Sequence, residues 1–123
     1  MKRALLTIAA LSFLPAALSA APEKLFNGKD LSGWKGLSKF WSVKDGVIVG
    51  ETKPDNPTRG NTFLVHQGNP VDDFELTLKA KITGNNNSGI QYRSKVVNEK
   101  NWVVSGYQMD MHPSQDYLGM MYE

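Results

Sequence analysis

The stretches "NNSGIQYRS" (Asn86–Ser94) and "GYQMDMH" (Gly106–His112) decide the fold. In both, apolar and polar residues alternate along the chain, which is the two-residue period of a β-strand. The apolar positions would close a hydrophobic core, and the polar positions would share the opposite face of a sheet. Those polar positions are Gln91, Arg93, Gln108, Asp110 and His112.

The rest of the chain repeats this pattern of short strands and turns. Asp72–Ile82 ("DDFELTLKAKI") has the most regular alternation and predicts a further strand. In Phe40–Glu51, the pair Asp45–Gly46 separates two β-forming runs, which is typical of a hairpin with a type I′ turn. No convincing helical period follows the first residues. The sequence therefore predicts an all-β protein, an antiparallel β-sandwich.

Residues 1–19 are predicted to be a signal peptide. Lys2 and Arg3 form a short basic region, an apolar run follows, and the small residues Ala17 and Ser19 fit a cleavage site. The apolar run is too short to span a bilayer. An N-terminal helix of the domain is the alternative. We expect a single domain over residues 20–123, exported to the periplasm or the cell exterior.

Removing the signal peptide also changes the charge balance. The chain has 14 Lys and Arg against 12 Asp and Glu, and two of the basic residues, Lys2 and Arg3, lie in the signal. The remaining 12 basic residues balance the 12 acidic ones, so no basic surface predicts nucleic-acid binding. No second apolar run predicts a membrane span. Without cysteine, the fold has to be stable without disulfides.

The last residues predict that the domain continues. Leu118–Glu123 ("LGMMYE") is apolar and aromatic, like a buried strand. A buried strand needs neighbours to pair with its backbone. We therefore expect the chain to be the N-terminal portion of a domain truncated at its C-terminus.

The polar face of the two opening stretches has two interpretations. Solvated faces usually carry Lys, Glu and Thr, whereas this one carries Gln, Arg, Asp and His. Such planar groups suit sugars, because a hydroxyl both donates and accepts hydrogen bonds. A sugar-binding groove and a plain solvated face both remain open. Asp110 and His112 have the spacing of two strand-borne metal ligands, but two residues are a weak signal; we predict no metal and no cofactor.

Five motifs in order resemble the 3-keto-disaccharide hydrolase family over essentially all of residues 20–123. The resemblance implies a concanavalin A-like jelly roll of two antiparallel sheets, with a sugar site on the concave face and further strands after Glu123. It implies an enzyme whose partner is a carbohydrate, a 3-keto sugar. The motifs are "LFNGKDLSGWKG", "FWSVKDGVIVGE", "DFELTLKAKI", "NNSGIQYRS" and "GYQMDMH…YLGMMYE".

The resemblance also implies the site residues. The family's motifs fall on Arg93, Gln108, Asp110, Tyr122 and Glu123, and Lys81 stands where the family usually has a basic residue. Strand alternation adds Gln91 and His112, of which His112 has no match in the family. We expect catalysis by Asp110, Glu123 and Arg93. We expect the sugar to contact Gln91, Gln108, Lys81, Tyr122 and His112.

Two routes of glycoside cleavage are open to these residues. A ketone at C3 acidifies the C2 hydrogen, so a base can start an elimination that expels the C1 oxygen, with Arg93 stabilising the enolate. The second route uses two carboxylates flanking C1. Asp110 and Glu123 suit either route. A non-catalytic carbohydrate-binding module and an exported scaffold domain are the alternatives to an enzyme, and exposed tryptophans would favour the binding module.

Overall fold

The computed structural model describes residues 21–84 and 86–123. The predicted signal peptide, residues 1–19, lies outside the described residues. All regular structure within them is strand, and they contain no helix able to cross a membrane. The strands are β1 (Trp34–Gly36), β2 (Trp41–Lys44), β3 (Val47–Gly50), β4 (Leu64–His66), β5 (Ser88–Asn98), β6 (Val103–Met111) and β7 (Met121–Tyr122).

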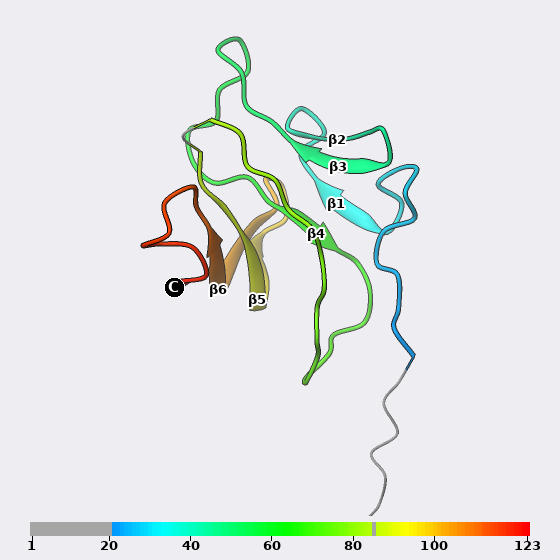
Figure 1. Ribbon diagram of the computed structural model, residues 1–123. Coiled ribbons are helices and arrows are strands. Elements are labelled where there is room, and N and C mark those ends of the chain that lie inside the picture. The colour runs from blue at the N-terminus through cyan, green and yellow to red at the C-terminus, as the bar shows by residue number, and fades with distance from the viewer. Residues whose placement is uncertain (1–20, 85) are drawn as a thin grey trace, which may run out of the picture.

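The strands form small antiparallel sheets. β1 pairs with β4, β2 pairs with β3, and β6 lies between β5 and β7 in a three-stranded sheet. Figure 1 shows β1, β2 and β3 together at one end of the molecule, and β5 and β6 at the other. The prediction of an all-β antiparallel fold is confirmed, and the arrangement is consistent with a β-sandwich.

The hairpin of β2 and β3 forms as its turn residues predict. Asp45 has φ 51° and Gly46 has φ 73°, the two positive values that a type I′ turn requires. Trp41 pairs with Gly50, and a Cβ on Gly50 would lie 2.6 Å from the indole ring. Phe40, just before β2, is the one apolar residue of the described chain that is buried, with 5% of its surface exposed.

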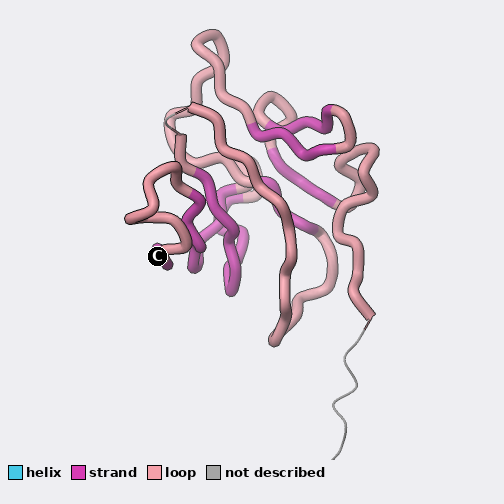
Figure 2. The backbone as a smooth tube through the Cα atoms, in the orientation of Figure 1, coloured by secondary structure: helices cyan, strands magenta, loops and turns pink. Residues whose placement is uncertain are grey.

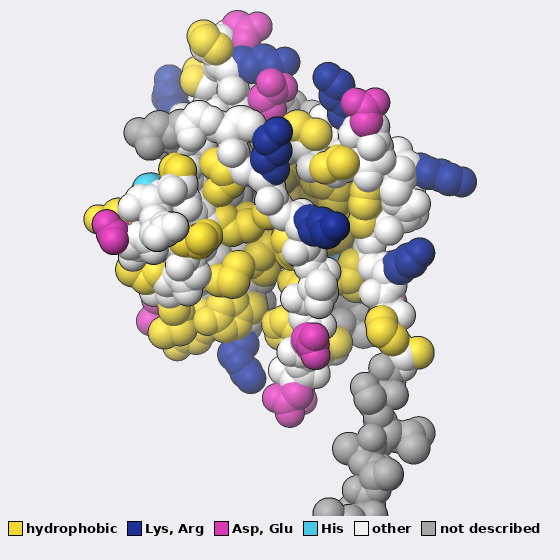
Figure 3. All heavy atoms as spheres, in the orientation of Figure 1, with side chains coloured by type: hydrophobic (Ala, Val, Ile, Leu, Met, Phe, Trp, Pro, Cys, Tyr) yellow, Lys and Arg dark blue, Asp and Glu magenta, His cyan; other side chains and the backbone are white. Residues whose placement is uncertain are grey.

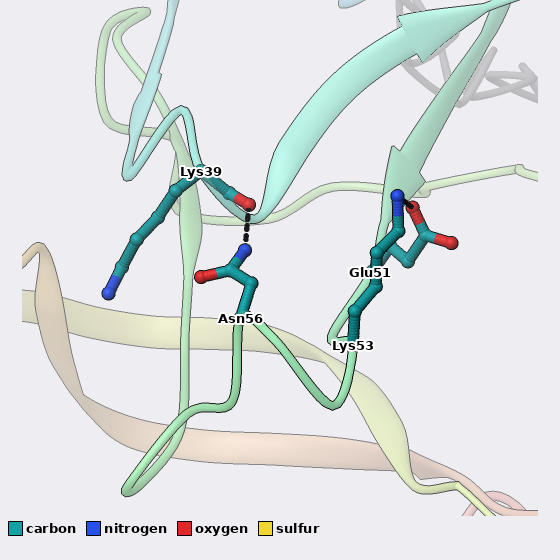
Figure 4. A network of polar contacts seen from close by, with 4 residues as sticks. All are labelled: Lys39, Glu51, Lys53 and Asn56. Atoms are coloured by element: carbon teal, nitrogen blue, oxygen red, sulfur yellow. Dashed lines mark hydrogen bonds and ion pairs between the residues drawn. The ribbon is translucent and has the colours of Figure 1, made fainter.

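The loop between β3 and β4 is attached to the start of β2 (Figure 4). The Asn56 side-chain amide donates a hydrogen bond of 2.5 Å to the Lys39 carbonyl. An exposed ion pair of 3.1 Å joins Lys53 to Glu51; such a pair adds little stability. The Asn56 hydrogen bond therefore fastens the loop that leads to Asn61 to the residues just before β2.

The predicted strand over Asp72–Ile82 is not observed. Residues 67–84 run from the end of β4 to a tip and back toward β5, and no strand of the described chain pairs with them (Figure 2). Alternation gives a segment two chemically distinct faces, but a strand also needs a neighbour for its backbone N–H and C=O groups. Phe74, Leu76 and Leu78 are accordingly exposed.

The hairpin of β5 and β6 contains a β-bulge that alternation does not predict. Tyr92 pairs with Tyr107 and Lys95 with Ser105, so two residues, Arg93 and Ser94, lie opposite Gly106. Arg93 adopts φ 46°, a left-handed conformation that is uncommon outside glycine. The bulge therefore interrupts the alternation of side chains after Tyr92. The rule that placed Arg93 on the same face as Gln91 no longer applies there.

Candidate functional site

One row of polar side chains crosses the sheet of β5, β6 and β7. Gln91 pairs with Gln108, and Gln108 pairs with Tyr122 on its other side. Residues directly opposite in neighbouring strands share a face of the sheet. The next row, of Ile90 and Met109, belongs to the other, apolar face. The two faces thus differ in polarity as alternation predicts.

The polar side chains are joined in a continuous chain of hydrogen bonds. The Ser94 hydroxyl lies within hydrogen-bond reach of two acceptors, Gln91 Oε1 (3.1 Å) and the Tyr92 carbonyl oxygen (2.7 Å), and Gln91 Nε2 donates to Gln108 Oε1 (3.0 Å). Gln108 Nε2 then donates to Asp110 Oδ1 (2.5 Å). At the far end, Asn87 Nδ2 lies 3.4 Å from Asp110 Oδ2. We call these five residues the amide chain.

Asp110 is the one charged residue of the described chain that is buried, with 6% of its surface exposed. Burial of a carboxylate is costly unless hydrogen bonds satisfy its oxygens. Gln108 and Asn87 supply them, and both donors are neutral amides. The Asp110 backbone is paired separately, because its N–H donates to Met120 and its carbonyl accepts from Gly119.

Gly89 makes room for this arrangement. It lies opposite Asp110 in the ladder, and a Cβ there would be 2.5 Å from Gln108 Cγ and 2.7 Å from the Met109 carbonyl oxygen. Any side chain at this position would displace Gln108. The absence of a side chain at Gly89, just before Ile90, therefore leaves the space that Gln108 occupies.

A pocket of about 210 Å³ opens beside the row. Glu123 is the one carboxylate among its lining residues, and Asp110 is not among them. Apolar and hydrogen-bonding groups both contribute, which suits a ligand with hydroxyls on a carbon ring. The lining residues are Asn61, Phe63, Gln91, Val104, Ser105, Gly106, Gln108, Tyr122 and Glu123.

Besides Asp110, three of the expected site residues do not line this pocket. Arg93 is exposed at the bulge, and Lys81 is exposed on the unpaired segment before β5. His112 follows the end of β6 and lines a second pocket with Ile82 and Leu118. Its Nδ1 accepts the Ser114 N–H at 3.0 Å, and its ring lies edge-on to Tyr117. The alternation rule no longer applies where the strand has ended.

Sequence reasoning missed residues at both ends of the site. Ser94 belongs to the amide chain only because the bulge turns it toward Gln91. Asn61 and Phe63 come from the loop before β4, which is distant in sequence and gives no local signal. Asn87 lies in the motif "NNSGIQYRS", which carries the resemblance to the family, but strand alternation gave it no role. Within the described residues, no group of three His, Asp or Glu side chains is placed to hold a metal ion.

The fold and the site define an all-β domain with a polar pocket on one sheet. A model of the "3-keto-alpha-glucoside-1,2-lyase-like domain" matches residues 21–123, and the chain belongs to this family. The chain is 29% identical over 85 residues to a protein of Bacteroides thetaiotaomicron named "3-keto-disaccharide hydrolase". That match covers 62% of this chain and 28% of the relative, so the chain spans well under half of the relative's length. No solved structure matches the chain.

Proposed function

We propose that the pocket binds a 3-keto glycoside and that the protein cleaves its glycosidic bond. The observation that carries the proposal is one pocket that combines Gln91, Gln108, Tyr122 and Glu123 in a member of this family. The two amides can recognise hydroxyl and carbonyl oxygens, and Glu123 is a base that the pocket exposes to a ligand. The name of the similar Bacteroides protein supports a 3-keto disaccharide as the substrate class.

Cleavage by elimination fits this set of residues best. A base removes the proton at C2, and the electrons pass into an enolate at C3. The enolate then expels the C1 oxygen, which takes up a proton, and a C1=C2 double bond remains. Addition of water across that bond places a hydroxyl on C1 and a hydrogen on C2, which completes a net hydrolysis. The family's description as lyase-like and the relative's name as a hydrolase agree with these two stages.

The number of available carboxylates favours elimination over direct displacement. A direct glycosidase needs two carboxyl groups on either side of C1, roughly 5–9.5 Å apart. Among the described residues that line the pocket, Glu123 is the one carboxylate, and the Asp110 oxygens are taken up by amides. We assign the base to Glu123 and the enolate contacts to the amide N–H groups. Arg93 remains a second proposed enolate-stabilising residue.

Export of the protein is also a proposal, and it is based on the sequence of residues 1–19.

A non-catalytic carbohydrate-binding module is the second candidate. Tyr122 lines the pocket with 59% of its surface exposed, and an exposed aromatic ring can stack on a sugar. A single carboxylate beside such a ring also suits a binding site. This candidate predicts affinity for the sugar without turnover.

Glu123→Gln in the complete protein tests the proposal. We expect the release of free sugar from a 3-keto-glucoside to fall by roughly 10²–10⁴-fold, the usual contribution of a positioned general base. In heavy water, the wild type should also exchange the C2 hydrogen, and the variant should not. Glu99→Gln, on the exposed turn between β5 and β6, is the matched control and should behave as the wild type.

Three outcomes separate the candidates. Turnover that depends on Glu123 supports elimination. Binding of the sugar by the wild type without turnover supports the binding module. A wild-type protein that neither binds nor cleaves any 3-keto sugar would rule out both candidate functions.

A further inference from the structure

We propose that Asp110 is a positioning residue that sets the direction of the amide chain and thereby the orientation of Gln108 and Gln91 at the pocket. Its effect on sugar recognition rests on the proposed function; its effect on the amides does not. Asp110 thus acts through two neighbouring side chains and not on the substrate itself.

The geometry argues against Asp110 as the base. A general base has to come within hydrogen-bond reach of the proton that it removes. Asp110 is 6% exposed, does not line the pocket, and uses both carboxylate oxygens for Gln108 and Asn87. Nor is it needed to pair β6, because its backbone is already bonded to Gly119 and Met120. Its side chain is therefore free to serve the amides.

An ionised carboxylate accepts hydrogen bonds and cannot donate them. Gln108 therefore has to turn its NH₂ group toward Asp110, which turns its oxygen toward Gln91. Gln91 has to donate to that oxygen from its NH₂ group, so the oxygen of Gln91 is left for the Ser94 hydroxyl. The direction of each amide follows from the charge at one end.

No other member of the amide chain can set this direction. The two ends of a side-chain amide are nearly the same size, so each amide can rotate by 180° without a steric cost. The Ser94 hydroxyl can donate to Gln91 Oε1, or it can donate to the Tyr92 carbonyl oxygen and accept from Gln91, so it serves either direction. With the direction fixed, Gln108 and Gln91 each keep one N–H beyond the chain. These are the donors available to an oxygen of the ligand.

Asp110→Asn removes the direction but keeps the shape. With asparagine at this position, both directions of the amide chain satisfy its hydrogen bonds, because Asn87 can also rotate. We expect two populations of the Gln108 and Gln91 side chains in place of one. Only one of them presents the correct donors, so the Kd or KM for the sugar should rise by roughly twofold to tenfold, with a smaller change in kcat.

The double variant Asn87→Asp with Asp110→Asn is designed to restore the single direction of the amide chain. The carboxylate at position 87 then accepts from the asparagine at position 110, whose oxygen faces Gln108 as the Asp110 oxygen does now. The direction of the remaining amides returns, although position 110 has no base. Asp55→Asn, which changes an exposed carboxylate in the loop after β3, is the matched control.

The readouts are side-chain amide NMR of Gln91 and Gln108 in the complete protein and steady-state kinetics with a 3-keto-glucoside. One set of amide signals in the wild type, two or exchange-broadened sets in Asp110→Asn and one set in the double variant would support the proposal. Unchanged amide signals in Asp110→Asn would overturn it. So would a loss of kcat on the order of 10² or more that the double variant does not restore, since that identifies Asp110 as the base.

The NMR result also separates this proposal from the proposed function. A wild type that neither binds nor cleaves the sugar refutes the function, but the amide signals of the variants still report on the direction of the chain.

Discussion

At the scale of single residues, Arg93 has an unusual backbone conformation, at the bulge beside the amide chain. Its φ of 46° costs a residue with a side chain roughly 1–2 kcal/mol. Left-handed residues other than glycine are concentrated at functional sites, where the surrounding structure holds them in place. Here the bulge opposite Gly106 holds it, two residues along β5 from Gln91.

Substitutions at Arg93 should separate stability from function. Arg93→Gly relieves the backbone and should raise the free energy of unfolding by roughly 1 kcal/mol. Arg93→Lys keeps the strain and replaces a planar, two-pronged donor with a point charge. If Arg93 stabilises the enolate, both variants should lose turnover although only one gains stability. Urea denaturation and the sugar-release assay measure the two effects.

An Arg93→Gly variant with unchanged or lower stability would mean that the bulge does not strain this residue. Turnover that survives in both variants would exclude Arg93 from the reaction.

At the scale of elements, the bulge in β5 depends on the absence of a side chain at Gly106. Gly106 has φ 150°, and a Cβ there would lie 2.6 Å from Ser94 Cα and 2.8 Å from the Arg93 carbonyl oxygen. Both are backbone atoms, which cannot rotate away as the end of a side chain can. Gly106 also lines the pocket, so the same residue shapes the bulge and the site.

Gly106→Ala should therefore destabilise the protein by about 1–3 kcal/mol, the usual cost of forcing extra volume into a packed position. It should also break the contact between Ser94 and Gln91, because Ser94 is the residue that has to move. Gly60→Ala is the control, since Gly60 has no atom within 4 Å of the added Cβ. Thermal unfolding of both variants gives the comparison. Equal melting temperatures would show that the β5–β6 ladder can absorb the methyl group.

The elements also show which features the sequence can predict. The turn at Asp45–Gly46 is local, so the two residues alone are sufficient to predict it. The strand expected at Asp72–Ile82 failed because pairing depends on a partner that local alternation does not report. The bulge at Arg93 is set by Gly106 on the opposite strand and is likewise invisible to alternation.

The site likewise contains residues that local sequence patterns predict and residues that they do not. Gln91, Gln108 and Asp110 lie on one polar face because a regular ladder preserves parity up to Tyr92. Tyr122 and Glu123 were expected from family resemblance, and the pairing of β6 with β7 brings Tyr122 to the same row. The role proposed for Asp110 could be inferred only from its hydrogen-bond partners, since residue type alone does not distinguish a base from a positioning residue.

At the scale of the whole molecule, the described chain leaves much apolar surface in contact with solvent. Phe40 is its one buried apolar residue, and thirteen large apolar side chains are exposed, among them Leu76, Leu78 and Met121. Figure 3 shows apolar side chains forming a broad continuous surface on one part of this view. Contiguous apolar surface of this kind is unusual for a stable monomer.

This distribution predicts that residues 21–123 are weakly stable alone and bind a hydrophobic dye such as ANS at neutral pH. Paired substitutions test it. Because Leu76 and Leu78 are exposed, Leu76→Thr with Leu78→Thr should reduce dye binding and change the free energy of unfolding by less than about 1 kcal/mol. Phe40→Ala should instead cost roughly 3 kcal/mol or more, because Phe40 is 5% exposed.

Three measurements test whether the apolar surface is exposed in solution: dye fluorescence, the far-ultraviolet circular dichroism melt and the sedimentation coefficient. Low stability, strong dye binding and a tolerant leucine pair are the expected result. A cooperative melt with little dye binding, and a large loss of stability in the leucine pair, would mean that these side chains are covered in solution. Sedimentation would then show whether a second copy covers them. The apolar surface would in that case be an interface, and not the cause of a weak fold.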